Sequence, residues 1–397
     1  MTGILRLALA AVMAMLLAAG HGPGTSAEAS LPPGFSDAVV ASVPQPIDLA
    51  VVERGGLRGA LYVTSKSGRL YFVPLSGQPR VALDLGGSTC SDGERGLLGV
   101  ALDPRFGAGE NSIYLYHTVS DGGSCFNRVS RFSVRPNGAV DAASGQPLAQ
   151  TARLVATNHN GGDLEFGADG MLYVSVGDNA RPSLAQKRTT YFGKILRITT
   201  EGRPAAGNPY RVSKGAAACG MAGRAKKAPC AEIFALGLRN PFQIAFAPGS
   251  STFAINDVGQ YTWEEVDLGR KGANYGWPQR EGPCPQGQTL PCADAPAAMT
   301  NPATWYGHDT GCESITGGAF VPASANWPAE YAGDYLFADF VCGSIFAAGW
   351  PPSGSPAPFS TFATGLGMIV ALEFDPVRPG TLLYTNLNGE VRRITVE

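Results

Sequence analysis

The sequence predicts an all-β protein, a six-bladed β-propeller built from four-stranded antiparallel sheets. The 397 residues include 52 Gly and 30 Pro, and only 16% are charged, which is typical of many short strands joined by tight turns. Short alternating apolar segments recur along the chain, about sixty residues apart. No stretch shows the apolar spacing of a long amphipathic helix.

Each recurring unit begins with a small or acidic residue beside Pro or Gly and continues into an aliphatic-aromatic strand. A glycine and a second strand then follow. A ring of such sheets leaves no long exposed edge, which keeps a large all-β chain from aggregating. We therefore expect one domain over 34–397, with six units starting in order at 61–71, 102–134, 166–198, 244–257, 335–346 and 372–394.

The first 27 residues are predicted to be a signal peptide. Arg6 precedes an apolar run over 7–19 that is short for a membrane span, and Thr25-Ser-Ala27 resembles a cleavage site with small residues. We expect a secreted or periplasmic protein with no membrane span after cleavage; an uncleaved anchor is the alternative. The net charge of -2 argues against nucleic acid as a partner.

All eight cysteines follow this leader, and an even count in an exported chain indicates disulfides. Zinc is the rival interpretation, but the chain has no Cys-x-x-Cys pair and no histidine at ligand spacing. Sequence order suggests four bonds, joining Cys90 to Cys125, Cys219 to Cys230, Cys284 to Cys292, and Cys312 to Cys342.

The stretch 157–179 predicts a β-hairpin with polar side chains at its mouth. Leu164 and Phe166 have strand spacing, and so does the apolar run 172–176, with a turn at 168–170 between them. A hairpin brings its ends together, so His159 and Asp178 should meet. A carboxylate beside an imidazole suits a general base, although a His among Asn and Gly is often only a loop residue.

Further polar residues lie at predicted strand ends, where propeller loops surround the axis. Arg239 could bind a carboxylate or a developing oxyanion, or form a structural salt bridge. Asp257 with nearby carbonyls could hold Ca²⁺. Glu264 and Glu265 alternate in direction, so we expect at most one to face the mouth and the other to be solvated.

Five motifs occur in order: Glu94-Arg-Gly-Leu-Leu-Gly, His159-x-Gly-Gly-x-Leu-x-Phe-Gly, Gly193-Lys-Ile-Leu-Arg-Ile, Gly-Leu-Arg239-Asn-Pro-Phe and Gly272-Ala-Asn-Tyr-Gly-Trp. Together they resemble the soluble glucose/sorbosone dehydrogenases, quinoprotein aldose dehydrogenases with a six-bladed propeller. The resemblance runs from about residue 34 to the C-terminus. It implies that pyrroloquinoline quinone (PQQ) lies over the axial mouth with Ca²⁺.

The resemblance also implies roles for individual positions. His159 would take the proton of a sugar hydroxyl as hydride passes to PQQ, and Asp178 would support His159. Arg239 would contact the quinone oxygens, with Asn240 beside it. An aldose or similar sugar would leave as its lactone, and electrons would pass to an external acceptor.

Two more positions follow from the same resemblance. Glu94 occupies the place of a Gln in glucose-oxidising members and would belong to the cofactor site. The backbone carbonyls of Gly259 and Gln260 would be Ca²⁺ ligands.

Two stretches depart from the pattern. Neither 340–343 nor 367–374 contains the basic residues that quinone-binding members have there; Lys214, Arg224, Lys226 and Lys227 would have to replace them. A second hypothesis is therefore a non-catalytic propeller of the same family that binds carbohydrate or protein. A third is a Ca²⁺-dependent lactonase.

Overall fold

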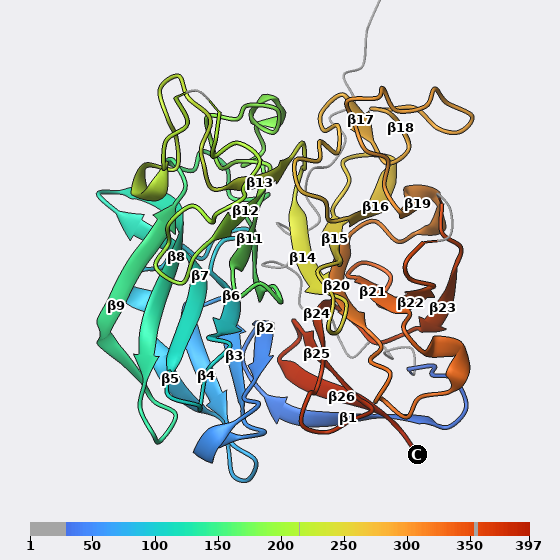
Figure 1. Cartoon of the computed structure of the whole chain (residues 1–397). Helices are drawn as coiled ribbons and strands as arrows, with labels where there is room; N and C mark the ends of the chain where they lie inside the picture. Colours follow the sequence, from blue (N-terminus) through green and yellow to red (C-terminus); the bar gives the residue numbers. More distant parts are fainter. Residues whose placement is uncertain (1–28, 214, 353–355) are drawn as a thin grey trace, which may run out of the picture.

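The computed structural model describes residues 29–213, 215–352 and 356–397, so the predicted signal peptide lies outside the described residues. Within that part, six four-stranded antiparallel sheets form a ring of blades (Figure 1). The innermost strands of neighbouring blades contact one another all the way round the axis. The predicted fold class is confirmed, and each predicted unit falls within one blade.

The strands of each blade follow the chain from the axis outwards. The first three blades contain β2 (Pro46–Val51), β3 (Leu61–Ser65), β4 (Arg69–Val73) and β5 (Arg80–Asp84); β6 (Leu97–Leu102), β7 (Ser112–Asp121), β8 (Ser124–Val134) and β9 (Val140–Gln150); and β10 (Gly161–Phe166), β11 (Leu172–Val176), β12 (Lys194–Ile198) and β13 (Ile233–Leu236). The next two contain β14 (Pro241–Phe246), β15 (Phe253–Asp257), β16 (Trp263–Leu268) and β19 (Thr304–Gly307); and β20 (Ile315–Phe320), β21 (Tyr335–Asp339), β22 (Ser344–Ala348) and β23 (Phe359–Ala363).

The sixth blade joins the two ends of the chain. Its inner strands are β24 (Ile369–Phe374), β25 (Thr381–Asn386) and β26 (Glu390–Val396), and its outer strand is β1 (Phe35–Ser42). β1 pairs antiparallel with β26, Phe35 opposite Val396, so the first strand closes the ring. A short ribbon, β17 (Arg280–Glu281) and β18 (Cys284–Pro285), lies outside the blades.

Every helix in the described residues is a single 3₁₀ turn. The turns are Gly55–Leu57, Gly86–Ser88, Pro182–Leu184, Gly220–Ala222, His308–Thr310 and Ala329–Tyr331. Over the same residues, no helix is long and apolar enough to cross a bilayer.

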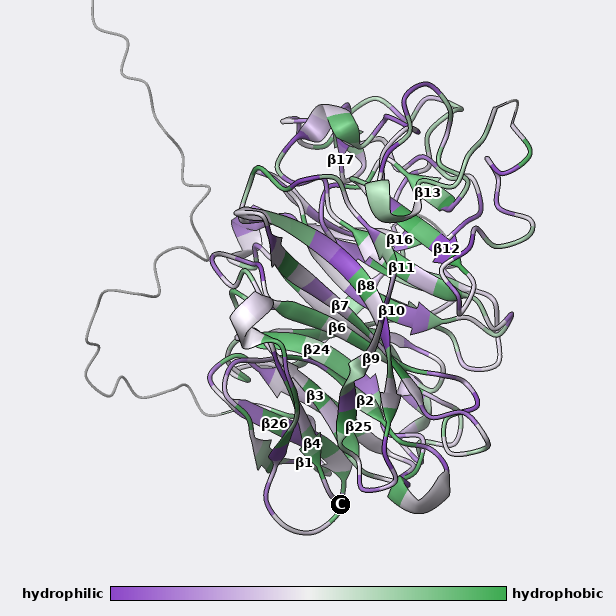
Figure 2. Cartoon of the chain, turned by 90° about the vertical axis from the view of Figure 1, so that its left-hand side faces the viewer, coloured by the Kyte–Doolittle hydropathy of each residue, from purple (hydrophilic) through white to green (hydrophobic). Residues whose placement is uncertain are grey.

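The hydrophobic core is divided among the six interfaces between neighbouring blades. Between the first two blades, for example, Tyr62 and Phe72 pack with Leu97 and Ile113. Both faces of an inner strand are buried, as in β3, where all five residues are inaccessible. Apolar residues therefore fill both faces of the sheets, as the green bands of Figure 2 show. Burying one large apolar side chain contributes roughly 1.5–3 kcal/mol, so these interfaces hold the ring together.

Hydrogen bonds from buried side chains also tie each blade to the next. Thr64 donates to the carbonyl of Leu98 at 3.0 Å. Asp163 accepts from the backbone N–H of Ile244 at 2.7 Å. Such bonds satisfy inner-strand groups that no sheet ladder reaches, and they fix the strand ends that form the axial mouth.

The four disulfides join the pairs that sequence order suggested: Cys90–Cys125, Cys219–Cys230, Cys284–Cys292 and Cys312–Cys342. Cys219–Cys230 lies in the connection between β12 and β13, and Cys284–Cys292 lies in the connection between β16 and β19. Cys312–Cys342 joins the segment before β20 to the turn between β21 and β22. Disulfides in such loops reduce the conformational freedom of the unfolded chain and stabilise the loop positions.

Candidate active site

The predicted hairpin consists of β10 and β11, and its turn contains Gly170 with φ +71°. Its open end brings the backbones of His159 and Gly177 into contact, where a Cβ on Gly177 would lie 2.2 Å from the His159 carbonyl oxygen. Only glycine fits there. His159 itself has φ +56°, a conformation that few side chains adopt and that often marks functional positions.

His159 and Asp178 meet at this end of the hairpin. Nδ1 of His159 lies 2.7 Å from Oδ1 of Asp178, and both side chains are buried. Trp277 donates its indole N–H to the other oxygen, Oδ2, at 2.8 Å. Because a carboxylate only accepts hydrogen bonds, Nδ1 carries the proton and Nε2 is left as the basic atom.

Arg239 comes from the next blade, where Asp257 fixes its backbone. The two oxygens of Asp257 accept the N–H groups of Arg239 and Asn240 at 2.9 and 2.7 Å. The guanidinium donates through Nε to Gln260 and through Nη1 to the carbonyl of Val258, at 2.9 and 2.8 Å. These contacts hold the cation rigidly and leave Nη2 for a ligand.

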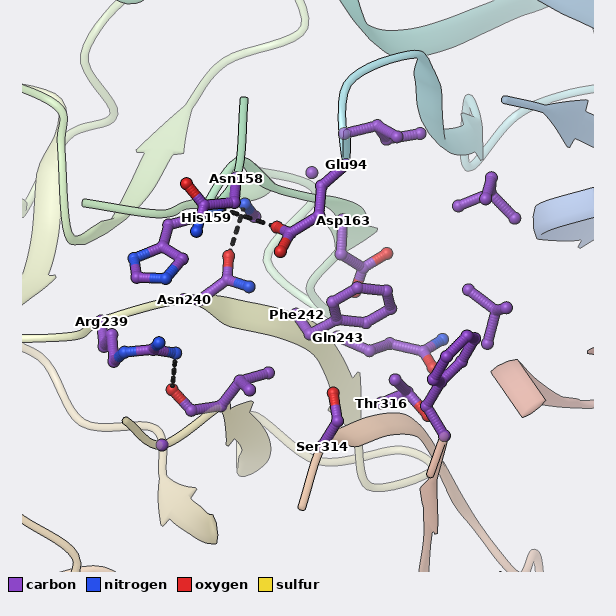
Figure 3. A pocket seen from close by; sticks show the side chains of 18 of the residues that line it. Glu94, Asn158, His159, Asp163, Arg239, Asn240, Phe242, Gln243, Ser314 and Thr316 are labelled. Atoms are coloured by element: carbon purple, nitrogen blue, oxygen red, sulfur yellow. Dashed lines mark hydrogen bonds between the residues drawn. The ribbon is translucent and has the colours of Figure 1, made fainter. Parts of the chain in front are cut away.

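The second blade supplies Glu94. Its Oε2 accepts from the backbone N–H of His159 at 2.7 Å, so the carboxylate is fixed beside the imidazole. Asn240 accepts from the N–H of Gly161 at 2.9 Å and ties Arg239's turn to the hairpin. Figure 3 shows these groups gathered around one pocket.

The pocket has a volume of about 320 Å³ and opens at the axial mouth. Six of the residues expected for cofactor, base or metal line it together, and Asp178 lies behind His159 rather than in the lining. The lining residues from the predicted set are Glu94, His159, Arg239, Asn240, Gly259 and Gln260.

The prediction for Glu264 and Glu265 was wrong, because neither side chain is solvated. Glu264 lies 2.8 Å from His308 Nε2 and also accepts from the N–H of Ile315. Glu265 follows it in β16, on the other face of the strand, and is also buried.

Glu265 forms a buried carboxylate cluster with Asp257 and Asp267, whose nearest oxygens all lie within 4.8 Å of one another. Both oxygens of Asp267 lack a hydrogen-bond partner in the described residues. Burial, together with the neighbouring carboxylates, raises the pKa of Glu265 and Asp267 well above their ordinary values. Three close carboxylate oxygens, of which those of Asp267 have no hydrogen-bond partner in the described residues, are a donor set that fits a hard cation such as Ca²⁺.

Two residues of the site were not assigned from the sequence. Trp277 ends the motif Gly272-Ala-Asn-Tyr-Gly-Trp, from which no role for the tryptophan is predicted. One oxygen of Glu281 accepts the four consecutive backbone N–H groups of residues 260–263 at 2.7 to 3.1 Å and thereby shapes the loop that carries Gln260. Their partners lie far away in the sequence, so local sequence patterns do not predict the roles of these two residues.

The charge of the pocket does not match a tricarboxylate such as PQQ. Arg239 is the one permanently cationic side chain among the described lining residues, and His308 is paired with Glu264. Neither Arg224 nor Lys226 nor Lys227 lines the pocket, and Lys214 lies outside the described residues. Four carboxyl groups line it instead: Asp48, Glu94, Asp163 and Glu313.

Two of these carboxyl groups are deep and their charge is reduced. Burial raises the pKa of Asp163 to about 7 and that of Asp48 well above its ordinary value. The negative charge of the pocket therefore comes mainly from Glu94 and Glu313. A quinone with three carboxylates would meet one available guanidinium and two opposing carboxylates.

The sequence is similar to a known protein family and to several individual proteins. The sequence profile of the glucose/sorbosone dehydrogenases matches residues 43–347. Aldose sugar dehydrogenase YliI of Escherichia coli is 31% identical over 224 residues, covering 56% of this chain and 54% of that protein. The HIPL2 protein of Arabidopsis thaliana is 34% identical over 227 residues, covering 52% and 32%. The chain thus spans about half, or less, of these curated relatives.

Solved structures share the fold. The PQQ-bound aldose sugar dehydrogenase of Streptomyces coelicolor superimposes with a TM-score of 0.70 at 24% identity, covering 93% of this chain and 100% of that one. The apo form of the E. coli aldose sugar dehydrogenase gives 0.73 at 23% identity, covering 91% and 100%.

Proposed function

This chain belongs to the glucose/sorbosone dehydrogenase family, and from that premise we propose that its axial pocket binds an aldose or similar sugar and that His159 takes the proton of a sugar hydroxyl. The observation that carries the proposal is the 2.7 Å contact between His159 and Asp178. It leaves an imidazole nitrogen as a base, in a mouth that a small polyol can enter.

Each polar group has a part in this proposal. Asp178 holds the Nδ1 proton and stabilises the imidazolium that forms when Nε2 accepts the hydroxyl proton. Trp277 keeps Asp178 oriented. Arg239 and Asn240 offer donors to sugar oxygens, and the fixed guanidinium orients the reacting carbon.

The full reaction proposed is oxidation of the sugar to its lactone, in which the reacting carbon loses a hydride as His159 receives the proton. PQQ, if bound, would supply the hydride acceptor that the family relationship suggests, with Arg239 and Asn240 beside it, and an external acceptor would take the electrons. The acidic pocket argues against this cofactor, so the PQQ-dependent activity stays a prediction. The residues present support the sugar half of the reaction.

The second candidate is a non-catalytic propeller that binds carbohydrate. The observation in its favour is the same excess of carboxylates over cations. The deciding experiment measures two quantities on one preparation: sugar binding by calorimetry, and dye reduction with a sugar panel after adding PQQ and Ca²⁺. Sugar binding with a shifted quinone absorbance and dye reduction supports the dehydrogenase. Sugar binding alone supports the second candidate, and the absence of both overturns the sugar site.

Ca²⁺ is proposed as a structural ion. Asp257, Glu265 and Asp267 would hold it through carboxylate oxygens, close to the turn of Arg239 and to the loop of Gly259 and Gln260. A divalent cation there would neutralise buried negative charge and fix the guanidinium indirectly.

Export is proposed on the same footing. Four disulfides support an oxidising compartment, secreted or periplasmic, and agree with the leader expected at 1–27.

A further inference from the structure

We propose that the sugar taken by this pocket is an amino sugar, with its ammonium group on the Glu94 carboxylate. The inference rests on the proposed function, because it names the substrate class of the same site. The charges that line the pocket are mainly negative and therefore do not suit an anionic ligand.

Glu94 is a fixed carboxylate at the place where the substrate must lie. Its Oε2 is held by the N–H of His159 at 2.7 Å, and Oε1 has no hydrogen-bond partner among the described residues. Glu94 makes no ion pair there either. Lys66 influences it only at longer range, since the Lys66 ammonium donates to the carbonyl of Ser91. Glu94 is therefore a free acceptor for a cation in the pocket.

The rest of the lining does not offset this charge. Glu313 enters from the connection before β20, is exposed, and has no ion pair within the described part of the chain. It interacts only at longer range with His308, whose imidazole is bonded to Glu264. The guanidinium of Arg239 is held by two neutral groups, Gln260 and the Val258 carbonyl, and makes no ion pair with Glu94 in the described residues. Figure 3 shows Glu94 and Arg239 reaching the pocket from different elements, with Asn240 between them. The pocket thus presents one unpaired guanidinium and one unpaired carboxylate, from different elements, near the base.

An aminodeoxy aldose matches this arrangement. Its ammonium is a donor with positive charge, and a carboxylate accepts from such a donor more strongly than from a neutral hydroxyl. Its ring oxygens and hydroxyls can accept from Arg239 and Asn240, as in any sugar. A uronic acid would place its carboxylate against Glu94 or Glu313 and be repelled. Charge therefore separates three sugars of the same size and ring form.

The test is calorimetric titration of the full chain with glucosamine, glucose and glucuronate at about pH 6, below the ordinary pKa of an amine. We expect glucosamine to bind about tenfold more tightly than glucose, as one charge-assisted hydrogen bond allows, and glucuronate to bind more weakly than either. The preference for glucosamine should shrink in high salt, because the pocket is open to solvent.

The variant Glu94→Gln keeps the size and the acceptor for the His159 N–H but removes the charge. It should bind glucosamine and glucose equally. The matched control is Glu330→Gln, which removes an exposed carboxylate outside the pocket and should leave the preference intact. Equal binding of glucosamine and glucose by the wild type, or a preference that survives in Glu94→Gln, overturns this inference while the sugar site stands. Failure of all three sugars to bind overturns the proposed function, and the inference with it.

Discussion

Trp277 donates its indole N–H to Asp178 at 2.8 Å across a sequence separation of 99 residues. The bond connects the loop after β16 in the fourth blade with the hairpin of the third. The same ring lies 5.8 Å from the guanidinium of Arg239. Trp277 therefore contacts both the carboxylate that orients His159 and the guanidinium of Arg239.

Replacing Trp277 by Phe should destabilise the protein, because Oδ2 of Asp178 would be left buried without a donor. Losing a hydrogen bond to a charged group typically costs about 1.5–3 kcal/mol, which denaturant unfolding can resolve. Trp305→Phe is the control, since that indole makes no hydrogen bond in the described residues. Equal losses in the two variants would mean that the ring matters only for packing.

His159→Gln tests the base. It removes the ionisable nitrogen while retaining a polar side chain of similar reach, so sugar oxidation by a reconstituted preparation should fall by roughly 10²–10⁴-fold. Sugar affinity should change little, because binding relies on other donors. Unfolding curves check that the fold is intact. Residual oxidation near the wild-type rate would remove His159 from the proposed reaction.

The hairpin could be predicted because its information is local. Period-two apolar spacing and a turn with Gly170 predicted both strands, and closure of the hairpin predicted that His159 meets Asp178. The disulfides followed from sequence order, which succeeded because each bond closes a loop within one region of the ring.

The features that were not predicted depend on contacts between segments far apart in the sequence. The contacts of Trp277 and Glu281 depend on how separate blades are juxtaposed, and no local pattern encodes that. One of Glu264 and Glu265 was expected to be solvated, because alternation predicts which face of a strand a residue occupies but not what covers that face. The charge of the pocket also became evident only when residues of several blades were assembled.

Stability should depend on pH through Glu373, which lines the opposite opening of the axial channel. Burial, with the nearby charges of Asp163, Glu53 and Asp375, raises the pKa of Glu373 to about 8. The folded protein then binds a proton that the unfolded chain releases above its ordinary pKa of about 4.5. This contribution to stability is complete below that value and is lost as pH rises towards 8.

Glu373→Gln should remove this loss. We expect the free energy of unfolding of the variant to equal that of the wild type at about pH 4 and to be roughly 1–2 kcal/mol higher at about pH 8. This difference is smaller than the full pKa shift implies, because the side chain is only half-buried and solvent screens its charge. Denaturant unfolding over that range provides the measurement, with Glu330→Gln as control. A constant difference between variant and wild type at all pH values would contradict the assignment.

Ca²⁺ should stabilise the protein through Asp257, Glu265 and Asp267. An ion that binds only the folded state adds about 2.7 kcal/mol at a concentration one hundred times its Kd, so millimolar Ca²⁺ should raise the unfolding temperature and a chelator should lower it. Asp267→Asn should abolish most of this response, because it removes a charge whose two oxygens have no other partner in the described residues. It should also make the chelated protein more stable than the chelated wild type, since it removes a buried carboxyl whose charged form is disfavoured by burial and by the neighbouring carboxylates. Asp121→Asn changes an exposed carboxylate far from the cluster and should retain the full response to Ca²⁺. A response to Ca²⁺ that is the same in both variants would place the ion elsewhere.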